Sequence, residues 1–111
     1  MPRTNITVVE ITRDGVAPTE VAGDATNGNQ FDHGARTFMR VRNADGAAAH
    51  IVTIITPGTV DGLAIADRVV SVPASATRYI GPFTNDYRQP DGKVYVDVDS
   101  AQLNLAVFRL P

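Results

Sequence analysis

Two histidines, His33 and His50, are the side chains of this sequence best suited to acid–base chemistry near neutral pH. No Ser or Thr stands in a G-x-S-x-G nucleophile pattern, so neither histidine has an evident partner in a catalytic triad. The sequence has no cysteine, which excludes a thiol nucleophile, a thiolate zinc site and a disulfide. We expect both histidines to lie at the surface or at strand ends. We therefore expect a chain that is not an enzyme and has no small-molecule substrate.

Asp97 and Asp99 stand two residues apart in an alternating segment, so both would project from one face of a strand. Such a pair could contribute to a calcium site, but calcium needs about six oxygen ligands from several segments. The oxygen-rich residues 24–32 lack the spacing of an EF-hand loop. We favour a solvent-exposed strand face for the two aspartates and expect neither a cofactor nor a metal.

The composition also narrows the classes of partner. The formal net charge of -2 is unlike the concentrated basic surface that binds phosphates, so no nucleic acid is expected. No run of about 18 apolar residues is present, and residues 1–12 lack the apolar core of a signal peptide. We expect a protein made in the cytoplasm with no membrane partner.

Alternation is the main secondary-structure signal. Apolar residues recur at a spacing of two in short runs that end at Gly, Pro, Asn or Asp, which predicts strands and no helix. The predicted strands span residues 5–12, 36–43, 50–57, 67–72, 77–83, 93–97 and 102–110. Seven or eight strands without helical crossovers predict one all-β domain over residues 1–111, an antiparallel β-sandwich or jelly roll. A closed barrel is the alternative.

For three segments the sequence supports a more specific prediction. The β-branched run within residues 50–57 predicts a central strand covered on both faces. Residues 60–66 are expected to form a loop around Asp61-Gly62. Residues 16–29 are rich in Ala, Thr, Gly, Asp and Asn, with too little apolar surface to order by core packing, and are expected to form an extended arm or long loop.

Protein binding is the function that these exclusions leave. Tyr87 lies beside Arg88 in a polar stretch, where an aromatic next to Arg resembles an interface anchor. The alternative is a Tyr folded back over the edge of the sandwich. Arg suits interface ion pairs because its planar fork binds carboxylates through two hydrogen bonds, although a GC-rich genome also explains abundant Arg. The candidate partner-binding residues are Tyr87, Arg88, Asn27, Asn29, Arg40 and Arg42.

The order of turn phrases carries a family resemblance. The run from Thr56-Pro57-Gly58 to Asp67-Arg68, followed by Val72-Pro73-Ala74 and by Tyr79-Ile80-Gly81-Pro82-Phe83, resembles small virion proteins of tailed bacteriophages. The same order extends over residues 36–96. The resemblance implies a decoration protein on the capsid exterior, with the major capsid protein and copies of itself as partners, and a trimer as an oligomer that capsid symmetry favours. It implies no catalytic residues.

Two other functions remain open. The protein could belong to the neck or tail, as an accessory or receptor-binding module. It could also be a carbohydrate-binding β-sandwich that uses Tyr87, Tyr79 or the face with Asp97 and Asp99, although sugar sites usually cluster aromatics and the sequence has no Trp.

Overall fold

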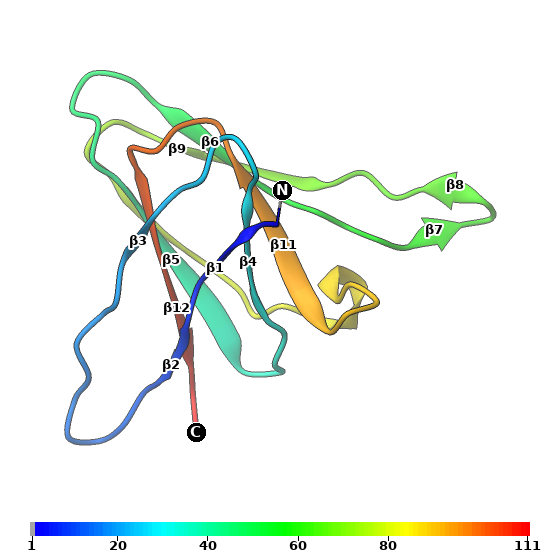
Figure 1. Cartoon of the computed structure of the whole chain (residues 1–111), viewed down its shortest axis with the longest axis horizontal. Helices are drawn as coiled ribbons and strands as arrows, with labels where there is room; N and C mark the ends of the chain where they lie inside the picture. The colour runs from blue at the N-terminus through cyan, green and yellow to red at the C-terminus, as the bar shows by residue number, and fades with distance from the viewer. Residues whose placement is uncertain (1) are drawn as a thin grey trace.

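The computed structural model describes residues 2–111, and within them the chain is all-β, with twelve strands and one short 3-10 turn (Figure 1). The strands are β1 (Thr4–Asn5), β2 (Val8–Glu10), β3 (Val21–Ala22), β4 (Asn29–Asp32), β5 (Thr37–Asn43), β6 (His50–Ile54), β7 (Thr59–Val60), β8 (Leu63–Ala64), β9 (Arg68–Val72), β10 (Thr77–Ile80), β11 (Lys93–Val98) and β12 (Leu103–Arg109), and the turn is η1 (Asn85–Tyr87). The all-β class is confirmed. The expected number of seven or eight strands is wrong, because the segment predicted as one strand over residues 5–12 contains two short strands, and β3, β4, β7 and β8 lie outside the predicted strands. No helix long and apolar enough to cross a membrane occurs between residues 2 and 111.

The strands form two five-stranded sheets and a separate hairpin. The first sheet has the order β1-β4-β11-β6-β9, and the second has the order β10-β5-β12-β2, with β3 also paired to β12. Strands β7 and β8 pair only with each other. Neighbours are antiparallel except for β1 with β4 and β2 with β12, which are parallel.

Both sheets contribute to one hydrophobic cluster. The first sheet supplies Phe31, Val52, Ile54, Val72, Val94, Val96 and Val98, and the second supplies Met39, Val41, Leu103, Leu105 and Val107. In β5 and β11 the buried residues alternate strictly with less buried ones, as the period of two predicts. The spacing of apolar residues therefore sets which face of each long strand points inward.

The predicted strand over residues 5–12 is divided between the two sheets. Residues of β1 pair with β4 in the first sheet, whereas β2 pairs with β12 in the second. Ile6, between the two strands, is buried in the common core. The start of the chain thus crosses the core and joins both sheets.

Residues 16–29, expected to form an extended arm or long loop, lie mostly outside strands and pack on their own chain. Glu20 binds Arg40 and Arg42, whose side chains project from the outer face of β5. β3 then pairs with β12, and Asn29 begins β4 fully buried. Backbone pairing and ion pairs order this segment, and neither is visible in its polar composition.

The expectation that residues 50–57 are covered on both faces is also wrong. Val52 and Ile54 point into the core, but Ile51 on the opposite face of β6 is 43% exposed. The neighbouring strand β9 likewise leaves Val69 exposed. No third layer covers this face among the described residues, so its apolar side chains meet solvent.

The contact between Glu20 and the two arginines predicts a pH-dependent contribution to stability. Arg42 donates from Nε and Nη2 over 3.1 and 3.0 Å, and Arg40 Nη2 donates over 2.7 Å. The hydrogen bonds from Arg42 are the largest influence that lowers the pKa of Glu20 below 4.5, against an opposing effect of burial. An acid whose pKa is lower in the folded state stabilises the fold above its unfolded pKa, and this contribution is lost as pH falls through the lowered value.

We therefore expect Glu20→Gln to lower the Tm by a few degrees at pH 7, and the difference from the parent protein to shrink as pH falls below 4.5. Thermal unfolding followed by circular dichroism over this pH range measures the effect. Asp14→Asn, at an exposed turn, is the control. A Tm difference for Glu20→Gln that is the same at every pH would contradict this assignment.

Candidate protein-binding surface

The most prominent surface feature is the hairpin arm, which we define as residues 56–67. Asp61 and Gly62 form its two-residue turn with φ angles of 54° and 77°, a left-handed conformation that an Asp-Gly pair adopts readily. At the base, the Thr56 N–H donates to Asp67 Oδ1 over 2.8 Å. Figure 1 shows the arm projecting away from both sheets. The loop expected over residues 60–66 is thus a hairpin, and its Asp-Gly pair between short β-prone runs is the signal that could have revealed it.

The tip of the hairpin arm is apolar. Val60 is 66% exposed and Leu63 is 71% exposed, and neither belongs to the hydrophobic core. Asp61 is the only charged residue between Thr56 and Ala66. Single exposed apolar residues are common on proteins, but two of them raised together on a projecting hairpin form a surface suited to contact with another protein.

Tyr87 lies where the hairpin arm joins the sheets. Its ring packs edge-on against Phe83, with centroids 6.0 Å apart, and its hydroxyl accepts a hydrogen bond from Arg68 Nε over 2.8 Å. The side chain is half-buried against the core cluster. Tyr87 is therefore folded back over the edge of the sheets, and part of its side chain remains exposed to solvent.

Two open hollows flank the contact between Arg68 and Tyr87. One, of about 460 Å³, lies towards β10 and includes Arg78, Tyr79 and Phe83. The other, of about 490 Å³, lies towards the hairpin arm and includes Ile65 and Val69. Arg68, Asp86 and Tyr87 border both hollows. Arginine and aromatic residues are enriched at the centres of protein interfaces, so we name these two hollows and their shared border the arm-base surface.

Comparisons with protein-family models, with curated proteins and with solved structures found no match to this chain.

Of the six predicted partner-binding residues, Tyr87 borders both hollows of the arm-base surface, whereas Arg88, next to it in the sequence, borders neither. Arg88 directly follows η1, and its side chain is exposed. Arg40 and Arg42 lie on the outer face of the second sheet, where Glu20 already binds both. The predicted set is thus divided between different parts of the molecule.

The two predicted asparagines have structural contacts within the chain. Asn29 is fully buried, and its Oδ1 accepts a hydrogen bond from the Asp24 N–H over 2.9 Å, so its side chain is not available to a partner. Asn27 is half-buried in the preceding turn, where its backbone N–H donates to Asp24 Oδ1 over 2.9 Å. Asp24 thus organises this turn, with its pKa held below the usual value chiefly by the hydrogen bond from the Asn27 backbone.

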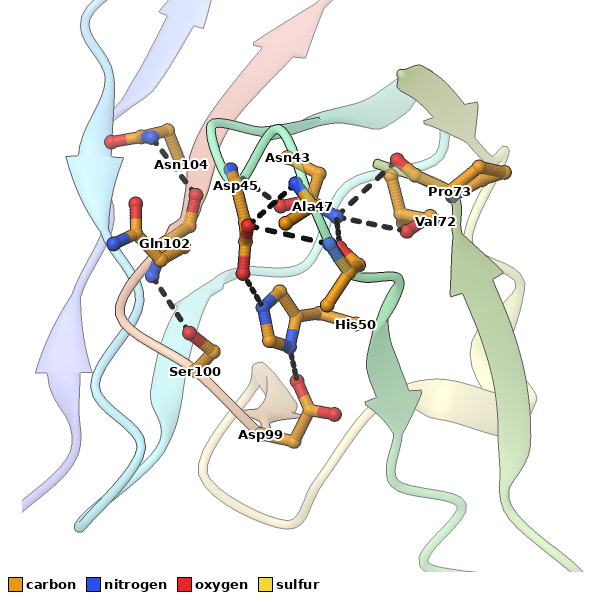
Figure 2. A network of polar contacts seen from close by, with 11 residues as sticks. Asn43, Asp45, Ala47, His50, Val72, Pro73, Asp99, Ser100, Gln102 and Asn104 are labelled. Atoms are coloured by element: carbon orange, nitrogen blue, oxygen red, sulfur yellow. Dashed lines mark hydrogen bonds and ion pairs between the residues drawn. The ribbon is translucent and has the colours of Figure 1, made fainter. Parts of the chain in front are cut away.

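His50 lies between two carboxylates at one end of the sheets (Figure 2). Its Nε2 is 2.9 Å from Asp45 Oδ2, and its Nδ1 is 3.3 Å from Asp99 Oδ1. Hydrogen bonds from the Ala47 N–H and then from His50 lower the pKa of Asp45. His50 is the first residue of β6 and borders neither hollow of the arm-base surface, so the triplet joins two loops to a strand end.

His33 likewise connects two segments of the chain, at the end of β4. It follows β4, and its Nε2 lies 2.9 Å from the Phe83 carbonyl oxygen and 3.1 Å from that of Thr84. Both contacts are to acceptors, so Nε2 carries the proton and donates. The histidine thereby holds the segment that precedes η1.

Asp97 and Asp99, which could have shared a cation, have different partners. Arg3 Nη1 binds Asp97 Oδ1 over 2.7 Å, whereas Asp99 faces His50. Across residues 2–111, no three His, Cys, Asp or Glu side chains are grouped so that they could hold a metal ion. The calcium interpretation thus gains no support from the geometry of these carboxylates.

Proposed function

We propose that this chain is a structural protein of a tailed-bacteriophage virion, and more narrowly a decoration protein that binds the outer surface of the major capsid protein lattice. The two sheets that share one core would form its rigid β-sandwich body, and binding rather than catalysis would be its activity. The resemblance to virion proteins supports the class of protein. Much of the resembling sequence, residues 56–68, forms the hairpin arm and its junction with β9.

The observation that carries the proposal is the arm-base surface. It combines exposed Arg and aromatic side chains with apolar ones around two shallow hollows rather than one enclosed cleft. The guanidinium groups of Arg68 and Arg78 suit carboxylates of a partner, and the Asp86 carboxylate suits a basic group beside them. Tyr87 and Val69 suit an apolar surface of the partner. A folded protein surface offers all of these, whereas a small molecule would leave most of this area uncovered.

Decoration requires many such contacts rather than one tight contact. Each copy would add a modest free energy of binding across a seam between capsid subunits, and the lattice would sum the contributions of its copies. A body that is rigid before binding loses little conformational entropy on docking. The shared core of the two sheets supplies that rigidity.

Co-sedimentation with capsids tests the proposed function. Purified protein mixed with undecorated capsids of the encoding phage should bind at a saturating, defined number of copies per capsid. Electron microscopy of virions should show added density distributed with icosahedral symmetry. Density confined to one vertex or to the tail would instead support the neck or tail module, and binding to a glycan array without capsid binding would support the carbohydrate module.

Arg78→Glu should weaken capsid binding at least about tenfold, because it reverses an exposed positive charge that borders the arm-base surface. The side chain of Arg78 is exposed, so the variant should fold, which thermal unfolding checks. Arg13→Glu is the matched control, since Arg13 is also exposed but lies in the turn before Gly15, away from the arm base. Equal capsid affinities for the two variants would remove the arm base from the proposed interface.

A further inference from the structure

A second apolar surface lies on the outer face of the second sheet, where Tyr79 is its exposed aromatic residue and also borders the arm-base surface. Phe38, Tyr79 and Phe108 gather there, with Phe38 5.5 Å from Phe108 and 6.4 Å from Tyr79 between ring centroids. They border a groove of about 300 Å³, closed on one side by residues 11–18. A second hollow of about 390 Å³ begins on the other side of Phe38 and reaches Leu110. We name these two hollows, which share Phe38 in their lining, the aromatic groove.

We propose that the tip of the hairpin arm of one copy of this chain occupies the aromatic groove of a second copy. This inference goes beyond the proposed function, because it concerns contact between copies and does not require a capsid. The tip offers Val60 and Leu63, and the groove offers aromatic faces. Tyr79 is 67% exposed, so burying it beneath an apolar side chain would remove an uncovered aromatic surface from water.

The charges of the two surfaces are complementary. The charged residues that border the aromatic groove are Arg36 and Arg40, and no carboxylate borders it. The tip carries one charge, on Asp61. Within residues 2–111, Arg36 has no Asp or Glu partner, and its Nη1 donates to a backbone oxygen of Pro111, the last residue of the sequence. An arm tip seated in the groove would bring the Asp61 carboxylate near Arg36 and near Arg40, which already binds Glu20 over 2.7 Å.

The hairpin arm and the aromatic groove of one chain lie too far apart to meet, so the proposed contact requires a second copy. In Figure 1 the arm extends to the right of the sheets, whereas β2 and the end of β12 lie at the lower left. The arm projects beyond the first sheet, between β6 and β9, while the groove lies on the outer face of the second sheet. A chain therefore cannot fill its own groove. A contact that joins different surfaces of identical chains closes a two-fold dimer when it is reciprocal, and it forms a ring or a filament when it is head-to-tail.

Complementation between two variants tests this contact. Leu63→Asp changes the exposed arm tip, and Tyr79→Asp changes the exposed border of the groove, so neither should unfold the protein. In sedimentation velocity, the parent protein should form oligomers, and each variant alone should be monomeric. An equal mixture of the two should form a one-to-one dimer, because the Tyr79→Asp chain still has an intact arm and the Leu63→Asp chain an intact groove.

Two further variants separate the apolar and electrostatic parts. Ile51→Asp adds the same charge at an exposed apolar position on the first sheet, and it should leave the oligomer intact. Asp61→Asn keeps a residue that tolerates the left-handed turn, so it should weaken association several-fold and reduce its salt dependence. Thermal unfolding shows whether each variant is folded.

Several results would overturn the inference. A monomeric parent protein at hundreds of micromolar, an oligomer that survives Leu63→Asp, or a mixture that remains monomeric would each do so. If the parent is monomeric and Leu63→Asp abolishes capsid binding, the arm contacts the lattice, and the proposed function survives without this contact. If complementation succeeds but capsids are not bound, the contact between copies stands and the proposed function fails.

Discussion

Phe31→Ala should lower the free energy of unfolding by about 3–5 kcal/mol, enough to leave a domain of ordinary stability close to unfolding at room temperature. Phe31 is among the largest fully buried side chains of the core, on a strand in the first sheet that faces the second. Its ring packs edge-on against Phe83, with centroids 5.1 Å apart. Truncation to Ala would remove this contact and leave a cavity that rigid sheets cannot close.

The effect should extend to the arm base, because Phe83 also packs against Tyr87. Urea unfolding measures the stability change, with Phe38→Ala as the control. Phe38 lies on the outer face of the second sheet and is only partly buried, so its truncation should cost less. Equal losses for the two variants would show that the core around Phe31 is looser than the structure indicates.

Asn43→Asp should destabilise the fold by about 2–4 kcal/mol at neutral pH, although the two side chains have nearly the same shape. Asn43 is buried at the end of β5, and its Nδ2 lies 3.0 Å from the carbonyl oxygens of Ala48 and Val72 and 3.3 Å from that of Pro73 (Figure 2). The amide donates to these oxygens. A carboxylate has no hydrogen to donate. Its oxygen would therefore repel the neighbouring carbonyl oxygens, and these carbonyl oxygens would lose their hydrogen-bond donor.

The direction in which the stability loss changes with pH shows whether the introduced carboxylate is its cause. Carbonyl oxygens around the introduced carboxyl would raise its pKa in the folded state, so the penalty should be largest at neutral pH and should decrease as pH falls through the raised value. Chemical unfolding at several pH values measures this trend. Asn104→Asp is the control, because Asn104 makes one exposed hydrogen bond, to the carbonyl oxygen of Gln102. A penalty for Asn43→Asp that does not change with pH would contradict the proposed donor role.

The long strands were predictable because each buries one face and exposes the other. In β5, Met39 and Val41 enter the core and Arg40 and Arg42 point outward, which a period of two encodes directly. The crossing at Ile6 was not predictable in the same way. No Gly or Pro marks it, and the apolar pattern continues across it although the hydrogen-bonding partner changes from β4 to β12.

Long-range contacts explain the other differences. Periodicity shows that β6 has two apolar faces, but it does not show how many layers cover them, and one is left open at Ile51. Residues 16–29 have a composition typical of a loop, yet Glu20 meets arginines that are 20 and 22 positions further along the chain. Neither property is contained in a local window of sequence.

The two candidate surfaces also differ in how far local sequence could predict them. Tyr87 and Arg88 are adjacent in sequence, so their proximity could be stated at once. The aromatic groove is assembled from residues 11–18, 35–40, 79–82 and 108–110, and only the pairing of β10, β5 and β12 brings those segments together. A site built from separate strands becomes visible only when their register is known.

The parallel pairing of β2 with β12 has a mechanical consequence. These strands lie near the two ends of the chain and run in the same direction, with Val8 opposite Val107 and Glu10 opposite Arg109. Tension applied between the chain ends would draw them past each other along their length, so their hydrogen bonds would bear the load together instead of breaking in succession. A chain tethered at both ends would thus resist stretching most strongly where it begins and finishes.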